Sequence, residues 1–124
     1  MTPVHWFLLL EALVWLPYGF YLLFVPGALG GIAAITASTQ TGTTELRAMY
    51  GGLQIALGTL CAMALGLATL RHTALTTLLF LTSGLALARL YGVSTDGELS
   101  AYTVFALVFE ILTAAGAAWF TLRD

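Results

Sequence analysis

The sequence has very few charged residues, and it contains no lysine at all. Charged residues make up 8% of its 124 residues, whereas soluble domains carry about 25%. Four arginines and six acidic residues give a net charge of −2, which excludes the basic footprint of a nucleic-acid binder. Hydrophobic residues make up 60% of the chain, and the mean hydropathy is +0.95. This composition predicts an integral membrane protein, with one domain over residues 1–124.

Cysteine and histidine are also scarce, which limits the chemistry that the chain can support. Cys61 is the only cysteine, so an intrachain disulfide and a Cys-x-x-Cys redox pair are excluded. His5 and His72 lie far apart in sequence, and we therefore expect no metal site. We assign no catalytic residue, and we expect no cofactor other than a bound quinone or lipid.

Four long apolar segments predict an all-α fold, an integral membrane four-helix bundle. The expected helices are residues 5–25, 45–70, 73–91 and 98–122. The start of the chain has no basic residues, unlike a secretory signal, so the first segment is expected to be a retained helix. Pro17 lies inside this segment and predicts a kink. Residues 27–44 form the longest connection, which is either a functional loop or a plain linker.

Helix starts are predicted from capping residues. Thr43 or Thr44 is expected to cap the second helix. Thr95 and Glu98 have the spacing of a capping box for the fourth.

Two rows of small residues have the four-residue spacing that lets membrane helices pack closely. One row is Gly58, Ala62 and Gly66, and the other is Gly84, Ala88 and Gly92. Together they exceed what one tight hairpin needs. We therefore expect a homo-oligomer, or a subunit of a larger membrane complex.

Polar side chains within the spans are the candidate functional residues, because ionisable groups are expensive inside a membrane. Arg47, Tyr50 and Gln54 are spaced so that an α-helix places them on one face. Arg89 and Glu110 lean toward each other, because helical side chains lean toward the N-terminus of their own helix. Glu11 lies close enough to a membrane interface for its side chain to reach it, and we expect it to have only a structural role.

The directions in which these side chains lean predict a polar pocket with Glu110 at its floor. The pocket is expected to open on the side of the membrane opposite the termini. The opposing interpretation is that such side chains only hold the helices together. The residues that we expect to bind a ligand are Arg47, Tyr50, Gln54, Arg89, Glu110, Tyr18 and Asp96.

Four short motifs carry a resemblance to a known family. They are residues 46–54 (LRAMYGGLQ), residues 86–92 (ALARLYG), the pair Asp96-Gly97, and Glu110. In these the chain resembles a bacterial membrane family catalogued as domain of unknown function 4345. The resemblance implies a four-helix protein of the bacterial inner membrane, without an established activity. The positions that it picks out are Arg47, Tyr50, Gly51, Gly52, Gln54, Arg89, Asp96, Gly97 and Glu110.

A more remote similarity links the four-helix plan to the DoxX-like group. Some members of that group accompany quinone-linked oxidoreductases. Its thiol-active members use cysteine pairs, which this chain lacks.

Three functions follow from these patterns as alternatives. The first is a small membrane protein that binds an amphipathic ligand, such as a lipid headgroup or a quinone, and that serves as an accessory subunit. The second is a proton-coupled transporter or membrane enzyme that uses Glu110, and the third is a structural subunit. Arg71 and Arg123 predict that both termini lie in the cytoplasm.

Overall fold

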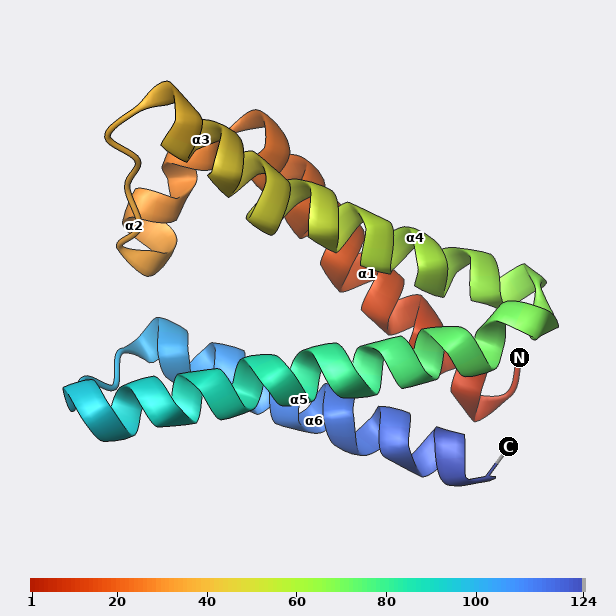
Figure 1. Cartoon of the computed structure of the whole chain (residues 1–124). Helices are drawn as coiled ribbons and strands as arrows, with labels where there is room; N and C mark the ends of the chain where they lie inside the picture. Colours follow the sequence, from red (N-terminus) through yellow and green to blue (C-terminus); the bar gives the residue numbers. More distant parts are fainter. Residues whose placement is uncertain (124) are drawn as a thin grey trace. The chain divides into compact units, whose positions relative to one another are not determined.

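The structure is a computed structural model, and it describes residues 1–123. Figure 1 shows the chain as a series of helices. The long elements are α1 (Pro3–Phe24), α3 (Gln40–Arg47), α4 (Leu53–Gly66), α5 (Arg71–Asp96) and α6 (Ala101–Arg123). The short ones are η1 (Pro26–Ala28), α2 (Leu29–Ala33), the π-helical η2 (Ala48–Gly52) and η3 (Ala68–Leu70).

Four helical stretches in this part of the chain are long and apolar enough to cross a membrane. They are Pro3–Phe24, Gln40–Gly66, Ala68–Asp96 and Ala101–Arg123. The prediction of an all-α membrane protein with four long apolar helices is therefore confirmed. The chain consists of two compact units, Met1–Leu70 and Arg71–Asp124. A single domain over the whole chain stays a prediction.

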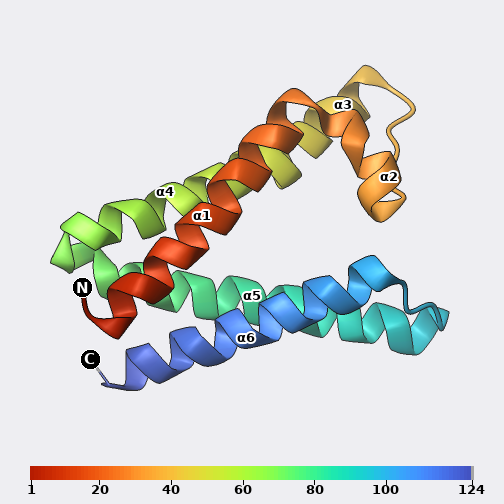
Figure 2. The ribbon, with the colours of Figure 1, turned by 180° about the vertical axis from the view of Figure 1, so that it is seen from behind.

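In the first unit, α1 lies antiparallel to the continuous run of α3, η2 and α4, as both ribbon views show (Figures 1 and 2). Glycines bring these helices close together. A Cβ atom added at Gly51 would lie 2.9 Å from Cα of Leu23, and one at Gly58 would lie 3.0 Å from the backbone nitrogen of Leu16. A Cβ atom added at Gly19 on α1 would lie 2.9 Å from the backbone nitrogen of Ile55. Close backbone approach through small residues is how membrane helices gain packing energy.

Only part of the two predicted rows of small residues makes such close contacts between helices. Gly58 packs against α1, whereas a Cβ atom added at Gly66, Gly84 or Gly92 would meet no atom within 4 Å in residues 1–123. The close contacts instead use Gly19 and Gly51, which lie outside both rows.

The second helix begins earlier than predicted. It begins at Gln40 and not at Glu45, because Thr39 caps it: the backbone N–H of Gly42 donates to Thr39 Oγ1 at 3.1 Å. The expected caps, Thr43 and Thr44, lie inside the helix. The connection over residues 27–44 is consequently shorter than expected, and part of it is helical in η1 and α2.

The turn after α4 also differs from the prediction. The α4 helix ends at Gly66, and the turn consists of Leu67 and η3. Arg71 and His72, which were expected to form this turn, are the first residues of α5.

In the second unit, α5 and α6 form an antiparallel pair joined by a short loop (Figures 1 and 2). The α5 helix continues to Asp96, beyond the predicted end at residue 91. Gly97 ends it with a positive φ of 76°, and its N–H donates to the carbonyl oxygen of Val93 at 2.9 Å. Such a glycine is a common helix terminator, because residues with a Cβ are strained there. The Asp96-Gly97 motif thus has a structural role at the end of this helix.

The start of α6 lies at Ala101 and not at residue 98. Ser100 caps this helix, since its Oγ accepts a hydrogen bond from the N–H of Thr103 at 3.2 Å. The expected capping box of Thr95 and Glu98 is therefore wrong. Thr95 belongs to the last turn of α5.

In α1, by contrast, the predicted bounds are nearly right, and the helix runs through Pro17 without a break.

Candidate functional site

The α5–α6 pair contains an ion pair between two residues that the sequence singled out. Nε of Arg89 donates to both carboxylate oxygens of Glu110, each at 3.0 Å. The Glu110 side chain is only 4% exposed, and that of Arg89 is 26% exposed. The structure therefore brings Arg89 and Glu110 together, in the way that their directions along antiparallel helices predict.

The position of the pair follows from the two helices that carry it. Arg89 lies about 10 Å before the end of α5, and Glu110 lies about 13 Å after the start of α6, at a rise of about 1.5 Å per residue. Both residues thus lie well inside membrane-length helices. Removing one partner from such a pair leaves a buried charge without compensation, which costs about 3–5 kcal/mol in buried sites of proteins.

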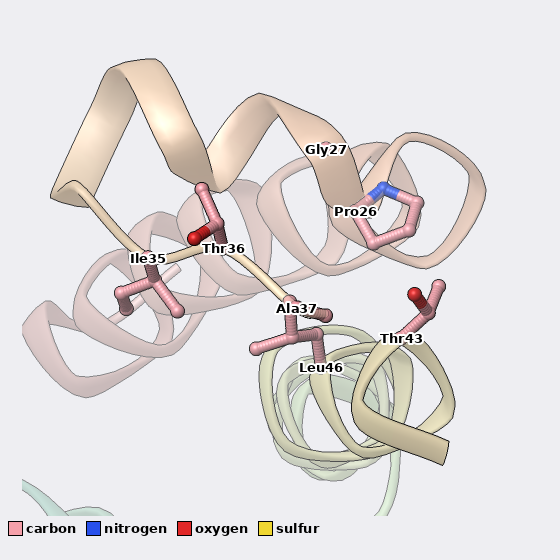
Figure 3. Close-up of a pocket in the computed structure, with 7 residues that line it drawn as sticks. All are labelled: Pro26, Gly27, Ile35, Thr36, Ala37, Thr43 and Leu46. Carbon is pink, nitrogen blue, oxygen red and sulfur yellow. The ribbon is translucent and has the colours of Figure 1, made fainter. Parts of the chain in front are cut away.

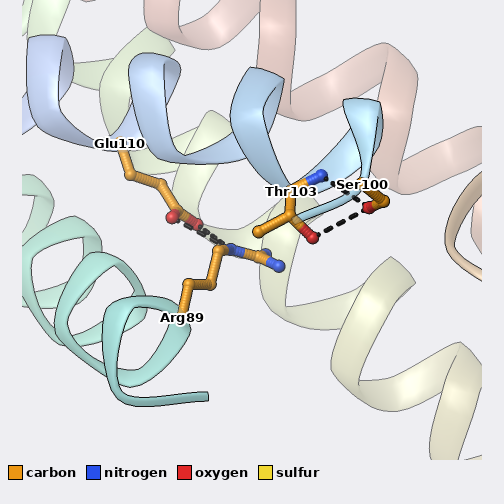
Figure 4. A network of polar contacts seen from close by, with 4 residues as sticks. All are labelled: Arg89, Ser100, Thr103 and Glu110. Carbon is orange, nitrogen blue, oxygen red and sulfur yellow. Dashed lines mark hydrogen bonds and ion pairs between the residues drawn. The ribbon is translucent and has the colours of Figure 1, made fainter. Parts of the chain in front are cut away.

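The guanidinium of Arg89 uses only one edge for Glu110. In Figure 4, Nε points at the carboxylate, whereas the two terminal nitrogens point away from Glu110. The Tyr102 ring lies 5.5 Å from the guanidinium carbon, within the range of a cation–π contact. Ser100 and Thr103, whose hydroxyls lie 3.0 Å apart, form a separate polar contact at the start of α6. The sequence reasoning missed Tyr102, although it lies two turns before Glu110 on the same helix.

Arg47 contacts the end of α1. Its Nη1 donates to the backbone carbonyl of Leu23. That carbonyl belongs to the last turn of α1, where helix carbonyls lack a partner within the helix. Arg47 thus caps the C-terminus of α1, where a cation is also favoured by the helix dipole. Gly51 packs on the same residue, Leu23.

The residues Arg47, Tyr50 and Gln54 do not follow regular α-helical spacing. The π-helical segment η2 covers Ala48–Gly52, and a π turn holds more residues than an α turn. Even so, Arg47 and Gln54 both face α1: Arg47 donates to the carbonyl of Leu23, and a Cβ atom added at Gly19 would lie 3.0 Å from Cβ of Gln54. The prediction that Tyr50 shares this face stays a prediction. Tyr50 and Gln54 are half-buried. Oε1 of Gln54 is buried and has no hydrogen-bond partner in residues 1–123.

The predicted binding residues therefore fall into separate groups. Arg89 and Glu110 form the ion pair of the second unit. Asp96 is exposed in the last turn of α5. The remaining four, which are Arg47, Tyr50, Gln54 and the half-buried Tyr18, belong to the first unit.

Glu11 is buried, contrary to the expectation that it reaches an interface. It is only 2% exposed, and one of its carboxylate oxygens accepts a hydrogen bond from Nε1 of Trp15 at 2.9 Å. The two residues are four apart in α1, which places them on the same face. This spacing of a carboxylate and an indole donor is the sequence signal that could have indicated the burial.

A small hollow lies elsewhere in the first unit, where the chain leaves α1 (Figure 3). Its volume is about 220 Å³, and its lining is mainly apolar apart from two threonines. The lining residues are Pro26, Gly27, Ile35, Thr36, Ala37, Thr43 and Leu46. None of the predicted binding residues is among them. As for metal ions, no group of three His, Cys, Asp or Glu side chains in residues 1–123 could hold one.

Comparison with known proteins gives one match. No curated protein and no solved structure matches the chain significantly. One family model, described as a domain of unknown function (DUF4345), matches residues 4–121, which is nearly the whole chain. The chain therefore belongs to this family of unknown function.

Proposed function

We propose that the protein binds the polar head group of an amphipathic ligand at Arg89, Glu110 and Tyr102. The observation that carries this proposal is that Glu110 engages Arg89 through Nε alone, while Tyr102 lies beside the same guanidinium. Nε holds the buried carboxylate, and the two terminal nitrogens point away from it. A guanidinium presents its donors in a planar fork that suits carboxylate, phosphate and carbonyl oxygens. Arg89 thus has donors beyond Nε that, together with Tyr102, can bind a ligand.

The surroundings of Arg89 favour an amphipathic molecule over a water-soluble one. The residue lies within a helix that is long enough to cross a membrane. Exposed apolar side chains precede and follow it on α5, including Leu87, Leu90 and Tyr91. A ligand that reaches the guanidinium must therefore keep its apolar part against hydrocarbon. A lipid headgroup and a quinone both satisfy this requirement.

A proton-coupled transport activity or enzyme reaction is the second candidate. The observation that favours it is the burial of Glu110, a carboxylate deep in a span with a single cation beside it in the α5–α6 pair. Intramembrane carboxylates commonly mark proton pathways.

The location and assembly of the protein belong to the same proposal. We place it in the bacterial inner membrane, as the family resemblance implies, and we place both termini in the cytoplasm on the strength of Arg71 and Arg123. We also propose a homo-oligomer or a subunit of a membrane complex. Support comes from Gly84 and Gly92, which lack close contacts within residues 1–123.

Copurification tests the binding proposal. Wild-type protein, Arg89→Gln and Arg123→Gln are purified from native membranes in mild detergent, and bound molecules are identified by mass spectrometry. Arg123→Gln is the matched control, because this arginine also packs over an aromatic ring, that of Trp119 at 3.7 Å, in the same helix pair. A bound amphiphile should be present with wild type and with Arg123→Gln, and absent with Arg89→Gln. Equal amounts with all three proteins would disprove the proposal.

A further inference from the structure

The ion pair between Arg89 and Glu110 constrains the charge of any ligand that binds beside it. One cation faces one carboxylate, so the pair is neutral as a unit. Within the α5–α6 pair, Glu110 is paired with Arg89 from α5, and the same guanidinium lies over the ring of Tyr102 from α6. An anion that docks on the other edge of Arg89 would bring a second negative charge to this neutral pair.

Two carboxylates that share one guanidinium at this depth cannot both stay ionised. Uncompensated charge is very expensive in a low-dielectric site, and neighbouring carboxylates respond by holding a proton between them. Glu110 is the more enclosed of the two partners of the ion pair, at 4% exposure against 26% for Arg89. The more accessible Arg89 meets a ligand first and the more enclosed carboxylate is the one better kept neutral, so the ligand keeps the charge and Glu110 takes the proton.

We infer that this site takes a carboxylic-acid amphiphile, such as a long-chain fatty acid, together with one proton that is held by Glu110. This inference rests on the proposed function. The exchange is balanced. The O–H bond of the acid breaks, its proton forms an O–H bond on the Glu110 carboxylate, and the ligand carboxylate pairs with the terminal nitrogens of Arg89. The site contains one cation and one anion before and after binding.

A carboxylic acid fits this exchange better than a phosphodiester lipid. A phosphodiester stays anionic and carries no proton to the site, so its binding would leave an excess negative charge. A fatty acid crosses hydrocarbon as the neutral acid and can bring the proton with it.

Proton counting tests the inference. Sodium oleate is added to the wild-type protein in phosphatidylcholine nanodiscs, in weakly buffered solution, and a pH electrode reads the proton uptake. Protein-free nanodiscs give the background, and [1-¹³C]oleate NMR reads the amount bound and its ionisation. Wild type should take up one proton for each bound oleate, and the bound label should have the shift of a carboxylate. Methyl oleate, which has no acidic proton, should cause no uptake.

Three variants test whether Glu110 holds the proton and whether Arg89 pairs with the ligand carboxylate. Glu110→Gln, which keeps an acceptor oxygen for Arg89, should bind oleate without proton uptake. Arg89→Gln should weaken oleate binding by about tenfold or more, as expected for loss of a charge-assisted contact. Arg123→Gln should behave as wild type. Proton uptake that persists in Glu110→Gln, or oleate binding to wild type without uptake, would overturn the inference and leave the proposed function standing. No oleate binding to wild type, with no other amphiphile copurified, would remove both.

Discussion

At the scale of single residues, the Arg89–Glu110 pair makes the clearest prediction. Glu110→Arg places two guanidinium groups side by side, and we expect it to destabilise the protein by about 3 kcal/mol or more. The double variant Arg89→Glu, Glu110→Arg restores the pair in reverse and should recover part of that loss. Unfolding in mixed micelles measures both. A double variant no more stable than Glu110→Arg alone would show that the two side chains do not interact.

A second prediction at this scale concerns Gln54. Its Oε1 is buried without a hydrogen-bond partner in residues 1–123, and such an acceptor costs about 1–3 kcal/mol. Gln54→Leu replaces the amide with an apolar group of similar size, so the free energy of unfolding should rise by about 1 kcal/mol. Gln54→Asn, which keeps the amide, should give no such gain. A clear loss of stability in Gln54→Leu would mean that the amide makes a stabilising bond.

At the scale of helices, adjacent glycines in η2 give a matched comparison for the packing of α1 on its partner. A Cβ at Gly51 would lie 2.9 Å from Cα of Leu23, whereas one at Gly52 would meet only the Arg47 carbonyl at 4.0 Å. Gly51→Ala should destabilise the protein by about 1–3 kcal/mol through overpacking. Gly52→Ala should leave stability unchanged or raise it by up to about 1 kcal/mol, because alanine favours a helix. Thermal unfolding in detergent compares the two, and equal effects would contradict the close approach of α1.

At the scale of the whole molecule, topology is the first prediction. In a background with Cys61→Ala, the variants Thr39→Cys and Arg123→Cys are treated with an impermeant thiol reagent on intact spheroplasts. Both positions are exposed, so each is open to the reagent when it faces outward. With cytoplasmic termini, only position 39 should be labelled. Labelling at 123 and not at 39 would reverse the orientation.

Assembly is the second prediction for the whole molecule. Gly84 is exposed on α5 and lacks a close contact within residues 1–123. Gly84→Ile fills the space that an approaching protomer would use, so we expect it to shift native mass spectra from oligomer toward monomer. Gly66→Ile, at an equally open glycine of α4, is the comparison. A wild-type monomer that persists at high protein concentration would contradict the proposal.

The sequence by itself determined the class of the protein and its long helices. Composition decides membrane residence, because a chain with so few charges has no other way to remain folded, and apolar length decides the four spans. The partnership of Arg89 and Glu110 was also predictable, since the lean of side chains along antiparallel helices is a local property. Helix ends were less predictable, because several threonines and serines compete as caps and only the folded turn selects among them.

Only the tertiary structure decided the roles of Arg47, Gln54 and Glu11. Arg47 caps α1 because folding brings the Leu23 carbonyl to it across 24 residues of sequence. A π-helical turn at Ala48–Gly52 interrupts the α-helical spacing between Arg47 and Gln54, and the packing on α1 still places both against that helix. Glu11 is buried, with its carboxylate bonded to the indole of Trp15. The roles of Arg47 and Gln54 depend on which helix packs against which and how closely, and that is set by non-local contacts such as Gly51 on Leu23, which no local pattern records.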